Sequence, residues 1–106
     1  EYKTLLPTLR SSVFACPVPS YATLQQALMV LKTADLRPAL KELTVPTLAI
    51  LGGKDTLVPQ GVGRLMQAVL PSLELMILDR AGHVPFLSHP ASLLTTIDNF
   101  IATGKP

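Results

Sequence analysis

The fold is decided by the stretch Val45-Pro46-Thr47-Leu48-Ala49-Ile50-Leu51, a short and nearly continuous apolar run that ends at Gly52-Gly53. A run of this length with glycines at its end is typical of a strand that is buried on both faces of a sheet. We therefore predict a buried strand over residues 45–51.

Downstream of this strand the apolar residues return at helical spacing, and Pro71 then ends the stripe. A second strand-length apolar run covers residues 73–78, and a further helical stripe follows Pro90 and ends at Gly104. The two stripes consist of Val62, Leu65, Met66, Val69 and Leu70, and of Leu93, Leu94, Ile97, Phe100 and Ile101. The order strand, helix, strand, helix predicts a βαβ crossover in a parallel sheet of an α/β fold.

The first part of the chain is less regular. Residues 1–20 are predicted to form a connector, because Cys16-Pro17-Val18-Pro19 cannot lie inside a helix. Residues 21–32 have helical spacing, with Ser20 placed to cap the start. Asp35 is placed to cap a short helix through Leu43.

The composition indicates that this chain contacts more protein. Hydrophobic residues make up 48% of it and charged residues only 15%, which leaves little polar surface for a small free globule. Two parallel strands alone would leave apolar edges open. We expect the remaining strands of the sheet to come from elsewhere, and the open edges predict association or strand exchange.

Several classes of function are excluded by charge and hydropathy. A net charge of +2 with scattered Lys and Arg argues against nucleic-acid binding. No run approaches the roughly 20 apolar residues of a membrane span. The single cysteine, Cys16, cannot form an internal disulfide, and no secretory leader opens the chain, so we expect a soluble protein of the cytoplasm.

Two loops carry residues suited to chemistry. Asp55 follows the strand that ends at Leu51, and His83 follows the strand that ends at Leu78. The carboxyl ends of parallel strands meet at one edge of a sheet, so the crossover should bring these side chains together. A carboxylate that faces an imidazole fixes its tautomer and stabilises the imidazolium. Taken singly, Asp55 is as readily explained as a turn residue and His83 as a structural histidine.

The segments around Asp55 and His83 resemble those of a known family. Residues 46–55 with Leu57-Val58-Pro59, then residues 81–86 and His89-Pro90, are similar to the last two strands of the α/β-hydrolase fold, and the resemblance covers residues 35–101. It implies that Asp55 is the acid and His83 the base of a catalytic triad, with chain order Ser, Asp, His. It also implies that residues 1–34 are the remnant of a helical cap and connector, and residues 35–106 the carboxyl-terminal part of the core.

A narrower resemblance is to the methyl ester esterases of biotin synthesis. It is carried by residues 17–19, 31–37 and 86–90. It implies hydrolysis of a methyl ester on an acyl chain held by acyl carrier protein, with no metal and no organic cofactor. Lys3 and Arg10 are placed to attract an acidic carrier, although ordinary solvation explains them equally well.

The departures from the family pattern concern the nucleophile. None of Ser11, Ser12, Ser20, Ser72, Ser88 and Ser92 lies in a Gly-x-Ser-x-Gly elbow. Cys16 is no replacement, because it precedes a proline in a connector. We therefore expect the nucleophile and the oxyanion hole outside these 106 residues, and the chain alone to be inactive.

The remaining site residues have weaker signals. Leu57 and Phe86 are predicted, with His83, to contact the substrate. Core packing is the rival explanation for Leu57, Phe86 and Val84, and it is favoured for Val84. His89 is expected to be a cap or surface residue, and no further ligands complete a metal site with His83.

Other functions stay open on sequence alone. A general carboxylesterase, a carbon–carbon bond hydrolase, a proline-releasing peptidase or a signalling receptor would use the same fold. A non-catalytic interaction module that recruits another chain through its sheet edge is the alternative from a different class.

Overall fold

The computed structural model describes residues 2–106, with side chains from residue 5 onward. The chain divides into two compact units, residues 1–36 and residues 37–106. The first unit contains helices α1 (Tyr2–Ala15) and α2 (Tyr21–Thr33). The second contains α3 (Arg37–Lys41), β1 (Leu48–Gly52), α4 (Gly61–Val69), β2 (Glu74–Leu78), α5 (Pro85–Ser88) and α6 (Pro90–Thr103).

The prediction of a connector over residues 1–20 was wrong for most of that segment. Residues 2–15 form α1, and within the described part of this segment only Cys16 to Ser20 lie outside the helices. The prolines at residues 17 and 19 exclude a helix only around themselves, and α1 also contains Pro7, which has no N–H to donate to the carbonyl of residue 3. The next helix is confirmed, since the Ser20 hydroxyl accepts the N–H of Thr23 at 3.1 Å and caps α2. The third helix is shorter than predicted and ends at Lys41.

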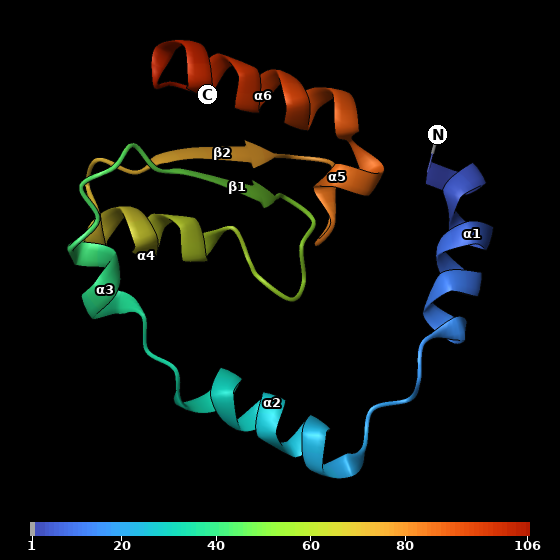
Figure 1. The fold of residues 1–106 in the computed structure, drawn as a ribbon. Helices are drawn as coiled ribbons and strands as arrows, with labels where there is room; N and C mark the ends of the chain where they lie inside the picture. The colour runs from blue at the N-terminus through green and yellow to red at the C-terminus, as the bar shows by residue number, and fades with distance from the viewer. Residues whose placement is uncertain (1) are drawn as a thin grey trace. The chain divides into compact units, whose positions relative to one another are not determined.

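The second unit has the predicted order of strand, helix, strand and helix. β1 and β2 are parallel, and their register runs from Leu48 opposite Glu74 to Gly52 opposite Leu78. β1 begins later than predicted, because Pro46 has no N–H to donate to a ladder and the carbonyl of Thr47 accepts the first cross-strand bond, from Glu74, at 2.9 Å. Both arrowheads point toward the same edge of the sheet (Figure 1).

Helices α4 and α6 lie on opposite sides of this sheet (Figure 1). A methyl group on Gly63 of α4 would lie 2.6 Å from a methyl carbon of Leu75 and 2.9 Å from one of Leu51, so the missing side chain lets α4 approach the sheet. On α6, Thr96 is buried and its hydroxyl donates to the carbonyl of Ser92 at 2.9 Å. Gly104, with φ of 72°, ends α6 in the left-handed conformation, as predicted.

The prediction that β1 is buried on both faces was wrong. Residues 48–51 of β1 and all of β2 are only half-buried. The reason is that the described residues form a sheet of two strands, so each strand has one edge without a neighbour. Only Leu70, Leu73 and Ala81 form a fully buried apolar core in the described part of the chain.

Candidate active site

The two loops beyond the carboxyl ends of β1 and β2 bring Asp55 and His83 together. Nδ1 of His83 lies 3.0 Å from Oδ2 of Asp55. The crossover through α4 returns the chain to the same sheet edge, so residues 28 positions apart become neighbours. The contact fits the predicted acid and base, whose catalytic roles stay predictions.

Asp55 is fixed by its own loop. Its second oxygen, Oδ1, accepts the backbone N–H of Leu57 at 2.8 Å and that of Val58 at 3.0 Å. Its side chain is 5% exposed. The N–H of Val58, followed by the hydrogen bonds from His83 and Leu57, holds the pKa of Asp55 below its ordinary value of 3.8, although burial opposes this shift. Asp55 is therefore ionised at neutral pH.

The charge on Asp55 determines which nitrogen of His83 carries the proton. An ionised carboxylate can only accept hydrogen bonds, so Nδ1 must be the donor in this pair. Nε2 of the neutral ring is then free to accept a proton from a third group. The side chain of His83 is 51% exposed, so it is accessible to such a group.

The predicted substrate residues lie on or directly after the same two loops. Leu57 follows Asp55 and is 73% exposed, and Phe86 lies on α5, directly after the His83 loop, and is 57% exposed. Sequence reasoning did not predict α5. Val84, which is also exposed, is the residue that precedes this helix. A role for Leu57 and Phe86 in substrate binding stays a prediction.

Sequence reasoning did not assign a role to Gly52 and Gly53. The sequence predicts only that the two glycines end a strand, yet each lies so close to the backbone of the His83 loop that an added Cβ would overlap it. The doublet of glycines directly before a loop with a candidate acid was the signal in the sequence for such a close approach.

His89 lies between α5 and α6 and is half-buried. Its Nδ1 lies 2.8 Å from the hydroxyl of Ser88, and its side chain makes no cap hydrogen bond to α6. Within the described residues no group of three or more His, Cys, Asp or Glu side chains is arranged to hold a metal ion. None of the helices in that part of the chain is long and apolar enough to span a membrane.

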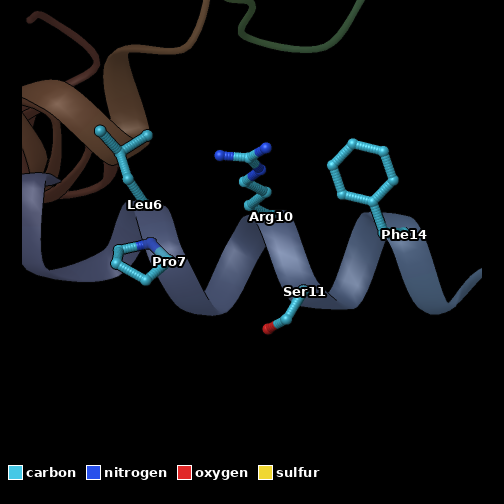
Figure 2. Close-up of a pocket in the computed structure, with 5 residues that line it drawn as sticks. All are labelled: Leu6, Pro7, Arg10, Ser11 and Phe14. Atoms are coloured by element: carbon cyan, nitrogen blue, oxygen red, sulfur yellow. The ribbon is translucent and has the colours of Figure 1, made fainter.

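The first unit has an open stretch of surface along one helix, α1, bordered by Leu6, Pro7, Arg10, Ser11 and Phe14. Figure 2 shows Leu6, Arg10 and Phe14 along one side of α1, with Ser11 on the opposite side. The guanidinium carbon of Arg10 lies 5.6 Å from the centre of the Phe14 ring, within the range of a cation–π contact. The side chain of Lys3, the other predicted contact for an acidic carrier, lies outside the described residues.

Comparison with known proteins shows which family the chain belongs to. The model of the alpha/beta hydrolase family matches residues 4–95. A pimeloyl-[acyl-carrier protein] methyl ester esterase of Citrobacter koseri is 47% identical over 83 residues, which are 78% of this chain and 32% of that protein. The esterase of the same name from Serratia marcescens is 44% identical over 94 residues, which are 89% of this chain and 37% of that protein.

A solved structure resembles the chain at the level of the fold. It is the crystal structure of an alpha/beta hydrolase enzyme from the metagenome of sediments of the lagoon of Mar Chica, Morocco. The TM-score is 0.66 at 24% identity, and the match covers 74% of this chain and 37% of that one. The chain spans about a third of the length of the relatives that it matches. The chain belongs to the α/β-hydrolase family.

Proposed function

We propose that this chain is the carboxyl-terminal part of a serine-type carboxylesterase that hydrolyses the methyl ester of pimeloyl-acyl carrier protein. In this proposal Asp55 is the acid and His83 the base of the catalytic triad. The observation that carries it is the 3.0 Å contact between Nδ1 of His83 and Oδ2 of Asp55. The choice of substrate is supported by two relatives named as pimeloyl-[acyl-carrier protein] methyl ester esterases, at 47% and 44% identity.

The proposed reaction needs a serine from outside these residues. The six serines of the chain have no Gly-x-Ser-x-Gly context, which is how this family presents its nucleophile. Nε2 of His83 takes the proton of that serine while the serine oxygen attacks the ester carbonyl. The imidazolium then gives the proton to the departing methoxide, so methanol leaves and an acyl-serine remains.

The second half of the cycle uses the same base. Nε2 of His83 takes a proton from water, the hydroxide oxygen attacks the acyl-serine carbonyl, and that proton passes to the serine oxygen as the acyl–serine bond breaks. The product leaves as the carboxylic acid and loses its proton to solvent to become the carboxylate. Asp55 stays ionised in both halves, in agreement with its lowered pKa, and stabilises the imidazolium. The chemistry proposed here requires neither a metal nor an organic cofactor.

The exposed apolar surface supports a role as one part of a larger protein. Each strand of the sheet has a free edge among the described residues, and a cavity of about 370 Å³ opens between α3 and α4. Apolar side chains dominate its lining, which consists of Arg37, Leu40, Val62, Leu65, Met66, Ala68 and Val69. We propose that the rest of the hydrolase covers the sheet edge in the intact enzyme, and that the chain without it self-associates through that edge.

An esterase chimera tests the proposal. In it, this chain replaces the matching 37% of the Serratia marcescens esterase, so that the relative supplies the serine. We expect the chimera to release methanol from pimeloyl-acyl carrier protein methyl ester, and the 106-residue chain alone to release none above the uncatalysed rate. A folded chimera that cleaves simple esters but not pimeloyl-acyl carrier protein methyl ester would contradict the proposed choice of substrate. A folded chimera without any esterase activity would favour a non-catalytic interaction module.

A further inference from the structure

The two loops of the candidate site stay joined by their backbones beyond the end of the sheet. Gly52 and Leu78 are the last residues paired in register. Past them, the N–H of Gly53 donates to the carbonyl of Leu78 at 2.9 Å, and the N–H of Lys54 donates to the carbonyl of Ala81 at 2.9 Å. Asp55 directly follows Lys54. The separation of the loops is therefore set by backbone contacts next to the acid.

No side chain fits at position 53. A Cβ added to Gly53 would lie 2.7 Å from both Cα and the carbonyl oxygen of Asp79, and real Cβ atoms essentially never come within 3.0 Å of a heavy atom outside their own and the adjacent residues. Both contacted atoms belong to the backbone, so no side-chain rotation relieves the overlap. The loop also has little room to retreat, because Ala81 is completely buried and its N–H is bonded to the carbonyl of Leu78.

We propose that Gly53 is a positioning residue, whose missing side chain lets the two loops approach closely enough for Asp55 to bind His83. An alanine at position 53 must move from 2.7 Å to about 3.4 Å from Asp79 to reach ordinary contact, which parts the loops by about 0.7 Å. The contact between Asp55 and His83 is already 3.0 Å, and hydrogen bonds of this kind extend to only about 3.2 Å. The added methyl group therefore breaks the pair.

The catalytic meaning of this inference rests on the proposed function. The pairing itself is measured without substrate, so a failure of Gly53 to position the acid is distinguishable from a failure of the esterase assignment. If the chimera is inactive but its His83 is still paired with Asp55 through Nδ1, the result argues against the esterase function and leaves the positioning role of Gly53 intact.

The inference is tested by NMR on the full chain labelled with ¹⁵N-histidine. The signal observed is that of the ring proton of His83. The unsubstituted chain should show a slowly exchanging, downfield proton bonded to Nδ1 of His83. Gly53→Ala should lose that signal, as should Asp55→Ala, which serves as the reference for complete loss. Gly82→Ala is the matched control, because it adds the same methyl group next to His83 where no atom beyond the two adjacent residues lies within 4 Å, and it should retain the signal.

Two measurements decide the outcome. Far-UV circular dichroism establishes which variants keep native secondary structure, and a Gly53→Ala chain that is native by this measure and retains the Nδ1 proton would overturn the inference. If Gly53→Ala does not fold, amide hydrogen exchange of the unsubstituted chain decides instead. The N–H of Lys54 should then be as protected as the amides of β1, and rapid exchange at Lys54 would contradict the close approach of the loops.

Discussion

The Asp55 loop and the His83 loop meet at one hydrogen bond, but they hold their side chains in different ways. The carboxylate of Asp55 is 5% exposed and accepts two backbone N–H groups of its own loop in addition to the imidazole. The ring of His83 is 51% exposed, and its contact with Asp55 at 3.0 Å is the one hydrogen bond of that ring among the described interactions.

This difference indicates that the two side chains depend on each other unequally for their orientation. In the proposed triad, the orientation of Asp55 is fixed by two backbone hydrogen bonds of its own loop and does not depend on His83. His83 depends on Asp55 for its orientation and leaves its other ring nitrogen accessible. Loss of the base should therefore remove the chemistry, whereas loss of the acid should leave a misoriented base that still has some activity.

The largest effect is expected from the exposed partner. In the esterase chimera, His83→Ala should lower kcat by up to about a million-fold, because no group then accepts the serine proton. His89→Ala is the matched control, since His89 contacts Ser88 and not Asp55, and it should keep kcat within a few-fold. Steady-state release of methanol measures both. A His83→Ala chimera with nearly full activity would remove His83 from the reaction.

Asp55→Asn should have the next largest effect. The amide is not a pure acceptor, so the ring of His83 is no longer held with its proton on Nδ1, and kcat should fall by about ten-thousand-fold. Asp79→Asn, at the exposed start of the other loop, is the control and should change kcat little. Equal losses for the two substitutions would indicate general damage to the sheet edge instead of a role for Asp55.

Phe86→Ala tests whether the segment after the His83 loop also binds substrate. If Phe86 contacts the acyl chain, KM should rise about tenfold while kcat stays nearly constant. Leu94→Ala on α6 is a control of equal exposure, since both side chains are 57% exposed in the chain. Unchanged KM for Phe86→Ala, or an equal rise for Leu94→Ala, would argue against a substrate contact at Phe86.

The smallest effect concerns stability against acid. The pKa of Asp55 is lower in the folded chain than its ordinary value of 3.8, so its ionised form stabilises the fold above that pH, and this contribution is lost as pH falls further. The difference in unfolding free energy between the unsubstituted chain and Asp55→Asn should be constant above about pH 5 and shrink below pH 3.8. Urea denaturation at several pH values measures it, and a difference that grows in acid would be contrary to this account.

Much of the second unit could be predicted from apolar spacing. The stripe before Pro71 and the one between Pro90 and Gly104 became α4 and α6, because periodicity and breakers agree there. The meeting of Asp55 and His83 followed from topology alone, since parallel strands end at one edge.

The missed features depend on tertiary contacts or on an interrupted pattern. The connector prediction extended the helix-breaking segment Cys16-Pro17-Val18-Pro19 over residues that form α1, and the four-residue helix α5 is too short to have a period. The half-burial of β1 reflects neighbours that are absent from the described sheet, which a run of apolar residues does not reveal. The role of Gly53 depends on the distance to Asp79, and no local pattern encodes that distance.

The most direct test of the central claim is a double-mutant cycle of Asp55→Asn and His83→Ala in the esterase chimera, measured as kcat. If the acid acts only through the base, the double variant should be no slower than His83→Ala alone. A double variant slower than His83→Ala by the full factor that Asp55→Asn costs by itself would mean that the two residues act independently, and would contradict the account.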